Sequence, residues 1–567
     1  MRKILTLIIL AVSLSASAQK KNHNYDVARN MDIFSALYKN LDMMYVDTLD
    51  ASEVVGTGIK AMLRSLDPYT EYYASDEVKN LKQMLTGKYA GIGAIVRKNM
   101  KTGNVCIDEP YFGMPAQEVG LRKGDEIISI DDSAMIGKEV SYVSSHLRGD
   151  AGSTFLLTFK RPGVKKEMQV KIKRRAIQLP SVPYFGMLDD KVGYISLTQF
   201  TEGCAQDIRR AFIELRQQGM KGFVFDLRNN GGGSLQEAIK IVNMFVPKGI
   251  TLVTTKGKMA KANHEYKTDA EPVDTVMPIV VLVNGNTASA SEITAGSLQD
   301  LDRAVVFGTR TYGKGLVQVP IDLPHNTSMK VTTSKYYIPS GRCIQAINYK
   351  HTGGGYKEHI PDSLTRVFYT AHGREVRDGG GIKPDIDFKT DTIPNIAVYL
   401  AGSGLDSTEV MFNWVVDYIM KHDSIAKPEE FRLTDEEWKD FSKAVVDAGF
   451  KYDRETEKLY GELIKVAKLE GYYDDNKDEF EALKAKLSHN LARELEKNER
   501  QIRRVLEADI IAAYHYQKGV IAYQNKCDKQ VAEAMRLVVS GDEYKKVFEA
   551  QVKPKVVEQP VSRKKRK

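Results

Sequence analysis

The sequence predicts a multidomain α+β protein, and three observations support this fold class. The chain has 567 residues, which is more than a single hydrophobic core usually organises. Apolar residues recur at helical spacing towards both ends. The middle of the chain has short β-branched runs and then buried strands that alternate with helices. We therefore expect helical N- and C-terminal regions, a small β-rich domain and an α/β core.

We place the domain boundaries where this patterning changes. The regions are a leader at 1–18, an N-terminal helical region at 19–86, a β-rich domain at 87–176, an α/β core at 177–398, a C-terminal helical domain at 399–552 and a disordered basic tail at 553–567.

The leader has the three parts of a secretory signal peptide. Arg2 and Lys3 supply positive charge, Ile4–Leu14 is apolar, and Ala16–Ala18 is a small-residue cleavage site before Gln19. A membrane anchor is the alternative, but the apolar stretch is well short of the roughly 20 residues that a spanning helix needs. We expect the leader to be removed and the protein to be periplasmic or otherwise exported.

The composition argues against nucleic-acid binding and against a metal site. The net charge of +8 is modest for this length, and no stripe of Lys and Arg is interleaved with aromatic residues. There is no CxxC pair and no HExxH motif, so we expect neither a metal nor another cofactor. Four scattered cysteines are expected to be free thiols: Cys106, Cys204, Cys343 and Cys527.

The two regions before the core have different periodicities. Helical spacing in Met31–Tyr45 and Val54–Leu66 predicts two helices, the second of which ends before the turn at Asp67 and Pro68. The β-rich domain follows, and its predicted strands include Glu126–Ile130, Phe155–Phe159 and Met168–Ile172.

The α/β core is predicted from apolar strands that run into helices. Gly222–Leu227, Pro278–Val283 and Ala304–Phe307 are the predicted buried strands. Beyond residue 400 the chain becomes rich in Lys, Glu, Leu and Ala, with helical spacing from Phe412 to Tyr523.

Ser289 follows the second of these strands at the start of a helix. Ligands of open α/β sheets bind at this edge, and a helix N-terminus offers unpaired amides there. A helix cap is the alternative, because Thr287, Ser289 and Ser291 all suit a cap position. The local pattern leaves both a nucleophile and a cap open.

Lys314 lies in a glycine-containing loop, Gly308–Gly315, which nearly matches the phosphate-binding pattern GxxxxGK[ST]. Gly315 lacks the hydroxyl that would hold Mg²⁺, and a strand-like segment follows instead of a helix. Strand alternation places Lys314 and Gln318 on one face, where a lysine shielded from water can act as a base. An exposed loop lysine is the alternative.

Gly231–Gly233 follows the first core strand without the GxGxxG pattern of a dinucleotide site. This run favours a close approach of backbone amides to a reacting carbonyl.

Taken together, these stretches resemble the C-terminal-processing peptidases, also called tail-specific proteases. The similar stretches occur in the family's order: Leu66–Tyr73, Gly91–Ala94, Pro115–Asp125, Gly193–Phe200, Asp226–Gly233, Val283–Asp300, Thr311–Gln318, Tyr336–Gln345 and Gly381–Asp385. The resemblance implies a crotonase-like α/β serine protease core with an inserted PDZ domain at 87–176.

The resemblance also assigns the site residues. It implies that Ser289 is the nucleophile, that Lys314, 25 residues later, is the general base, and that Gln318 orients this lysine. The backbone amides of Gly232 and Ala290 match the oxyanion hole. In a further match, Asp300 stands at an acidic position that supports the site. Thr287 replaces a serine of the family motif and Gly231 replaces a frequent proline, but neither change removes a reacting group.

The PDZ-like domain is expected to bind the free C-terminal end of a protein or peptide substrate. The carboxylate-binding loop matches Gly91, Ile92, Gly93 and Ala94, whose successive amides suit an anion. Arg148 is expected to report peptide binding to the active site. A homo-oligomer or an adaptor protein is a further candidate partner. The alternative function is a secreted, non-catalytic peptide-binding adaptor, which the presence of both Ser289 and Lys314 disfavours.

Overall fold

The computed structural model describes residues 23–75, 77–78, 88–346, 361–389, 391–402, 404–487 and 490–549. The predicted leader and basic tail therefore lie outside the described residues. The chain forms two compact units. Among the described residues, the first unit contains 23–75 and 320–331, and the second contains the rest.

The first unit contains α2 (His23–Met44), α3 (Ala51–Arg64) and β1 (Glu71–Tyr73). Asp50 caps α3 by accepting a hydrogen bond from the Glu53 N–H. The strand β1 corrects the expectation of an all-helical region at 19–86. It pairs antiparallel with the first part of β18 (Thr327–Tyr337), which is distant in sequence and invisible to local periodicity.

The β-rich domain has a main sheet, a separate pair of strands and two short helices. Its sheet has the order β3-β4-β5-β7-β8, and β6 pairs with β5. A separate pair, β2 and β9, is antiparallel. The elements are β2 (Lys88–Gly91), β3 (Ala94–Lys98), β4 (Val105–Pro110), α5 (Pro115–Glu118), β5 (Glu126–Ile130), β6 (Ser133–Ala134), α6 (Val140–Leu147), β7 (Thr154–Lys160), β8 (Met168–Lys173) and β9 (Arg175–Gln178).

The core of the second unit is a six-stranded sheet in the order β10-β11-β12-β15-β16-β21, parallel except for the β10–β11 pair. Helices connect its parallel strands, as the sequence predicts. The elements are β10 (Tyr184–Met187), β11 (Val192–Ser196), α7 (Cys204–Gln217), β12 (Gly222–Asp226), α8 (Leu235–Asn243), β15 (Ile279–Val283), α9 (Ala290–Asp300), β16 (Val305–Gly308) and β21 (Ile386–Asp387).

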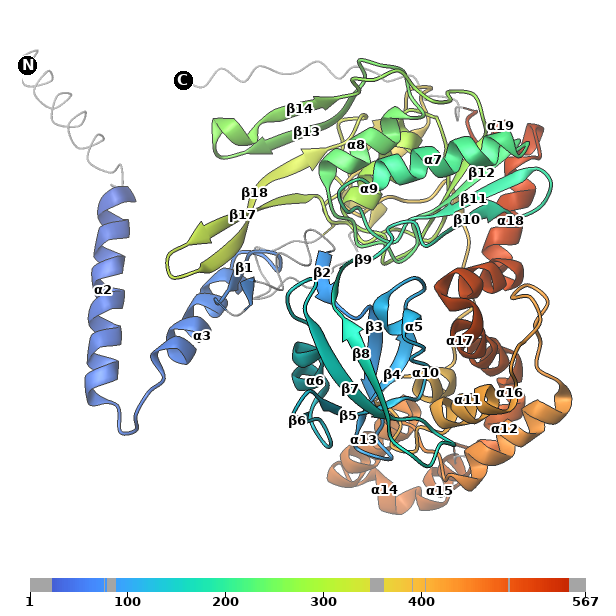
Figure 1. The fold of residues 1–567 in the computed structure, drawn as a ribbon. Coiled ribbons are helices and arrows are strands. Elements are labelled where there is room, and N and C mark those ends of the chain that lie inside the picture. The colour runs from blue at the N-terminus through green and yellow to red at the C-terminus, as the bar shows by residue number, and fades with distance from the viewer. Residues whose placement is uncertain are drawn as a thin grey trace, which may run out of the picture. The chain divides into compact units, whose positions relative to one another are not determined.

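Helices cover both faces of this sheet (Figure 1). On one face, side chains such as Phe223 and Phe225 pack with α7, α8 and α9. On the other face, Val224 packs with Val531 and Leu537 of α18 (Lys529–Val538). Burial on both faces explains why the central strands are apolar throughout.

Further strands and short helices flank the sheet: β13 (Thr251–Gly257), β14 (His264–Lys267), β17 (Leu316–Leu323), β19 (Val367–Tyr369), β20 (Glu375–Arg377) and 3₁₀ turns at Ala260–Ala262 and Asp362–Leu364. The C-terminal helices are α10 (Asn395–Ala401), α11 (Val410–Lys421), α12 (Asp435–Asp447), α13 (Glu455–Leu469), α14 (Tyr472–Asp475), α15 (Lys477–Leu487), α16 (Leu491–Lys497), α17 (Glu499–Cys527), α18 and α19 (Asp542–Lys546). Tyr516, with φ 55°, interrupts α17.

Within the part of the chain that the structure describes, no helix combines the length and the apolar character needed to cross a membrane. The four cysteines are unpaired, and Cys106 and Cys204 are buried.

Candidate active site

Ser289 lies at the turn between the buried strand β15 and helix α9. Its backbone has φ 57° and ψ −116°, a combination that is uncommon for a residue with a side chain. The Ser289 N–H donates to the Glu292 carboxylate at 2.9 Å, and the Ser289 carbonyl accepts from the Ile293 N–H at 2.9 Å. These contacts hold a conformation that costs of order 1–3 kcal/mol and that is typical of functional sites.

The loop after β12 packs against this turn. Gly232 has φ 99°, and a Cβ built on it would lie 2.8 Å from the Cβ of Ser289. The Asn230 carbonyl accepts a hydrogen bond from the Ala288 N–H at 3.0 Å. A glycine at position 232 is therefore required for the backbone to come this close to Ser289.

The two amides predicted to form the oxyanion hole have different partners. Ala290 is the first residue of α9, so its N–H has no acceptor inside the helix. The Gly232 N–H donates to Oδ1 of Asn230 at 2.9 Å. The Gly232 amide must therefore leave a side-chain acceptor before it can bind an oxyanion.

Lys314 lies in the loop between β16 and β17, two residues before β17 begins. Strand alternation therefore does not extend to Lys314, which corrects the argument that this lysine and Gln318 share a strand face. Gln318 lies on β17 and donates its Nε2 to Oγ1 of Thr332 at 3.2 Å. The loop is supported by Gln345, whose Oε1 accepts from the Gly315 N–H at 2.7 Å.

Glu292, which the sequence did not assign to the site, connects the Ser289 turn to the Lys314 loop. Its Oε2 accepts from the N–H groups of Ser289 at 2.9 Å and Lys314 at 2.8 Å. Its Oε1 accepts from the Gly313 N–H at 2.7 Å and from the Thr311 hydroxyl at 2.5 Å. The sequence signal for Glu292 is its place three residues after Ser289, where a capping box also puts a glutamate.

Glu292 is fully buried, and burial raises the pKa of its carboxyl to about 7. The four hydrogen bonds oppose this rise, because all of them favour the ionised form. Three of the four partners are backbone N–H groups that can only donate, so these contacts favour the carboxylate, whereas the Thr311 hydroxyl can also accept.

Tyr336 makes a second connection between the same two segments. Its side chain is 1% exposed and its hydroxyl is hydrogen-bonded to the Lys314 carbonyl. The hydroxyl also lies 3.3 Å from the Ser289 carbonyl oxygen. Tyr336 lies in a stretch that resembles the family, Tyr336–Gln345, but the sequence alone predicts no role for it.

Asp300 lies at the opposite end of α9 from Ser289, roughly 15 Å away along the helix axis. Its Oδ1 accepts from the buried Arg342 guanidinium at 2.7 Å, and its Oδ2 accepts from the Ser340 N–H at 3.0 Å. The structure therefore does not bring Asp300 to the reacting residues. It attaches the far end of α9 to the segment that follows β18.

The loop Gly91–Ala94 joins β2 to β3, and β3 is at the end of the sheet order. Gly93 has φ 70°, and a Cβ there would lie 2.5 Å from the Cβ of Met114. The Ile92 carbonyl accepts from the Ala116 N–H at 2.8 Å, which fixes the loop against α5.

Arg148 directly follows α6 and is exposed. Its guanidinium lies 5.3 Å from the centroid of the Tyr89 ring, and the Gly149 N–H donates to the Ala90 carbonyl at 3.3 Å. The structure therefore brings Arg148 beside the strand that leads into the glycine loop.

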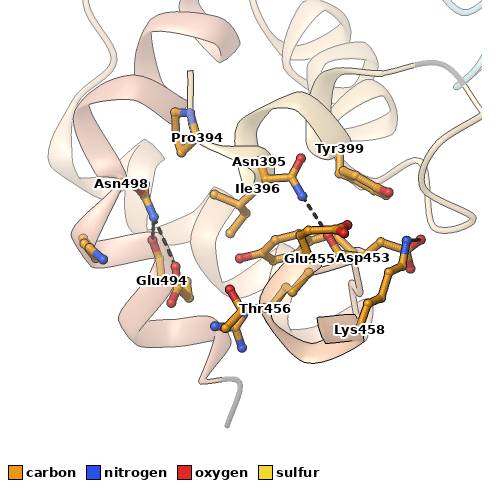
Figure 2. Close-up of a pocket in the computed structure, with 13 residues that line it drawn as sticks. Pro394, Asn395, Ile396, Tyr399, Asp453, Glu455, Thr456, Lys458, Glu494 and Asn498 are labelled. Carbon is orange, nitrogen blue, oxygen red and sulfur yellow. Dashed lines mark hydrogen bonds and ion pairs between the residues drawn. The ribbon is translucent and has the colours of Figure 1, made fainter. Parts of the chain in front are cut away.

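A pocket of about 630 Å³ lies in the C-terminal helical domain (Figure 2). Both positive and negative side chains line it, including Arg454, Lys458, Asp453 and Glu455. Asn395 donates to the Asp453 carbonyl at 2.7 Å across it. None of the predicted site residues lines this pocket.

Models of known protein families match three parts of the chain. "Peptidase family S41" matches residues 191–352, "PDZ domain" matches 90–172, and "Probable PDZ-protease, C-terminal helical domain" matches 402–538.

The chain is also similar to individual proteins. A "Carboxy-terminal-processing protease" of Bartonella bacilliformis is 34% identical over 348 residues, which cover 60% of this chain and 79% of that protein. A "Probable CtpA-like serine protease" of Staphylococcus epidermidis is 32% identical over 345 residues, which cover 60% of this chain and 69% of that protein. The solved photosystem II D1 C-terminal processing protease is 27% identical, with 64% of this chain and 88% of that chain covered and a TM-score of 0.36.

The sheets, helices and matched models together define a multidomain serine peptidase that carries a PDZ domain. Within that class, the chain belongs to the C-terminal-processing peptidases.

Proposed function

We propose that this chain is an exported endopeptidase in which Ser289 is the nucleophile and Lys314 is the general base. The observation that supports this most strongly is the turn at Ser289. It follows a buried strand, opens a helix, has a left-handed φ of 57°, and lies against the bare backbone of Gly232. Such a turn exposes a hydroxyl beside backbone amides, as a nucleophile requires.

The proposed reaction proceeds by acyl transfer. Neutral Lys314 takes the proton of the Ser289 hydroxyl while the oxygen attacks the scissile carbonyl. The amides of Ala290 and Gly232 stabilise the oxyanion, once the Gly232 N–H has left Asn230. Lys314 then gives the proton to the leaving amine, and water hydrolyses the acyl-enzyme by the same proton relay.

Two other residues have indirect roles in this proposal. Gln318 orients Lys314 from β17, and Asp300 supports the far end of α9 through its buried ion pair with Arg342. We also propose that the α/β core is of the crotonase-like kind and that the PDZ domain is inserted before it.

Substrates are proposed to be proteins or peptides bound through their free C-terminal ends. The amides of Gly91–Ala94 would receive the terminal carboxylate, and the edge of β3 would pair with the residues before it. Arg148, beside the same loop, would sense the bound peptide. The leader at 1–18 supports export to the periplasm or beyond the cytoplasmic membrane, and an oligomer or an adaptor is a further proposed partner.

The test compares Ser289→Ala and Lys314→Ala with wild type in a fluorescent peptide-cleavage assay. Both variants should lose hydrolysis while their free energies of unfolding stay within about 1–2 kcal/mol of the wild-type value. Ser297→Ala, on the same helix α9, is the control for removing a hydroxyl and should stay active. Substantial turnover by Ser289→Ala would exclude this nucleophile.

The same assay tests tail recognition when the substrate is a protein with an apolar C-terminus, used as the free acid and as the amide. Because a carboxylate accepts charge-assisted hydrogen bonds, the free acid should be hydrolysed about tenfold or more faster than the amide. Equal rates on both substrates would leave the serine chemistry intact and remove the proposed role of Gly91–Ala94.

A further inference from the structure

The two proposed reacting groups come from different segments of the core. Ser289 opens α9, whereas Lys314 precedes β17, with α9 and β16 between them. Proton transfer between a hydroxyl and an amine requires the two heavy atoms to be about 2.6–3.2 Å apart. A displacement of about 1 Å can cost two orders of magnitude in rate, so the relative position of the two segments has to be fixed.

Glu292 fixes the relative position of the two segments by binding their backbone N–H groups. One oxygen, Oε2, accepts from the N–H of Ser289 at 2.9 Å and from the N–H of Lys314 at 2.8 Å. Because both backbone nitrogens contact this one oxygen, the distance between the Ser289 and Lys314 nitrogens cannot exceed the sum of these two distances. Oε1 binds Gly313 and Thr311 of the same loop, so the carboxylate holds the loop at several points.

Tyr336 contacts the backbone carbonyl groups of the same two residues, Ser289 and Lys314. Its hydroxyl is hydrogen-bonded to the Lys314 carbonyl and lies 3.3 Å from the Ser289 carbonyl. Tyr336 is on β18, in a third segment of the core, and is almost completely buried. The backbones of Ser289 and Lys314 are thus bridged by two side chains that approach from different elements.

We propose that Glu292 and Tyr336 are positioning residues that hold the Ser289 turn and the Lys314 loop at the separation needed for proton transfer. This inference rests on the proposed roles of Ser289 and Lys314. Neither residue touches the substrate in this proposal, and both act through the backbone of the reacting residues.

The competing explanation is that Glu292 only caps helix α9. The neighbouring helix α8 supplies a control for the loss of a buried carboxylate at the same helix position, because Glu237 stands three residues after the N-cap Ser234, as Glu292 does after Ser289. Glu237 is also buried, but it accepts from the Ala205 N–H and from Lys240, so it does not contact either reacting segment.

The experiment compares Glu292→Gln with Glu237→Gln. Glutamine keeps the side-chain size but has only one acceptor oxygen, so its NH₂ group faces either the N–H groups of Ser289 and Lys314 or the N–H of Gly313, and the contacts on that side are lost. We expect kcat to fall about 100-fold with KM changed less than about threefold, since the loss is in alignment and not in binding. Glu237→Gln should keep kcat within about threefold of wild type, at temperatures where both variants are folded.

Tyr336→Phe is the second variant, with Tyr337→Phe on the adjacent residue as its control. Loss of the Tyr336 hydroxyl should lower kcat about tenfold, and loss of the Tyr337 hydroxyl should not. The effects of Glu292→Gln and Tyr336→Phe should not multiply in the double variant, because both act on the same separation.

Three outcomes separate the hypotheses. If Glu292→Gln lowers the melting temperature but keeps wild-type kcat, Glu292 is a cap and the inference is wrong. If Glu292→Gln does not fold, an unchanged kcat in Tyr336→Phe overturns the inference instead. If Ser289→Ala or Lys314→Ala remains active, the proposed Ser289–Lys314 chemistry is wrong, whatever the effects of the Glu292 and Tyr336 variants.

Discussion

At the scale of single residues, the site depends on backbone conformations that side chains usually avoid. Ser289 has φ 57°, and in the loop after β12 Asn229 has φ 59° and Gly232 has φ 99°. The contacts around Glu292 and Asn230 supply the hydrogen bonds that hold these conformations. The site is therefore sensitive to small changes in backbone freedom.

Replacing Gly232 by Ala should abolish most activity. The new Cβ would lie 2.7 Å from the Ala288 carbonyl oxygen and 2.8 Å from the Ser289 Cβ, at a φ that L-residues rarely adopt. We expect at least about a 100-fold loss of kcat/KM and a loss of about 1–3 kcal/mol in the free energy of unfolding. Gly285→Ala is the control, because its nearest neighbouring atom is 4.0 Å away. Chemical denaturation and peptide hydrolysis measure both effects, and an active Gly232→Ala enzyme would contradict the close packing.

The ionisation of Glu292 should move activity and stability in opposite directions with pH. Burial raises the pKa of its carboxyl from 4.5 to about 7. The N–H groups of Ser289, Gly313 and Lys314 can only donate and therefore favour the ionised form, so activity should fall as the pH drops through about 7. The neutral form avoids a buried charge, so the stability it contributes is fully present below about pH 4.5 and is lost as the pH rises through about 7.

The ratio of kcat/KM between wild type and Glu292→Gln, measured across pH, tests this ionisation of Glu292. Glutamine at this position has no titratable proton, so the comparison reports the ionisation of Glu292. From pH 5 to about pH 8, the ratio of wild-type to variant kcat/KM should rise while the difference in melting temperature falls. Parallel profiles of the two enzymes would show that Glu292 does not titrate in this range.

Sequence motifs pointed to the residues proposed to react but not to those proposed to position them. Ser289 and Lys314 lie in recognisable stretches, whereas Glu292 looks like an ordinary helix cap and Tyr336 like an ordinary strand residue. Their contacts join segments that are distant in sequence, and periodicity carries no information on such contacts. The engagement of the Gly232 amide by Asn230 was unpredictable for the same reason.

At the scale of elements, the apolar strands of the core were predictable. The runs at Gly222–Leu227 and Pro278–Val283 correspond to β12 and β15, because burial on both faces leaves an unmistakable apolar pattern. That a helix near residue 530, α18, covers the second face of the core sheet was not predictable. α18 lies far along the chain, and its amphipathic pattern is that of any surface helix.

Truncating a side chain on α18 should therefore weaken the peptidase core. Leu537 is 4% exposed and packs with Val224 and Val280 of the sheet. Leu537→Ala should lower the free energy of unfolding by about 2–4 kcal/mol, whereas Leu469→Ala, at an 88% exposed position on α13, should change it by less than about 0.5 kcal/mol. Equal effects in denaturant titrations would mean that α18 does not stabilise the sheet.

At the scale of the whole molecule, charged residues connect the β-rich domain to the C-terminal helices. Arg97 of β3 is ion-paired with Glu409, and both side chains are buried. Lys123 binds Asp509 of α17 at 2.9 Å and is also buried. The Arg97 guanidinium additionally lies 4.4 Å from the centroid of the Phe412 ring. The PDZ domain is thus joined to the helices by buried ion pairs, and removing one partner of such a pair would leave an uncompensated buried charge.

Glu409→Gln should be strongly destabilising, because it leaves the buried Arg97 without its counter-charge. We expect a loss of about 3 kcal/mol in the free energy of unfolding. The adjacent residue of β3 supplies the control, since Lys98 pairs with Glu139, whose side chain is 72% exposed. Glu139→Gln should cost less than about 0.5 kcal/mol. Similar losses in the two variants, measured by urea unfolding, would show that Arg97 is reached by water.

The position of α18 in the chain also has a consequence for how the enzyme is made. The helix that covers the second face of the peptidase sheet spans Lys529–Val538, far along the chain from the strands that it covers. A protein is synthesised from its N-terminus, so these strands leave the ribosome long before α18 does. The second face of the sheet can be covered only once Lys529–Val538 has been synthesised. Until then, the apolar residues of this face remain open to chaperones.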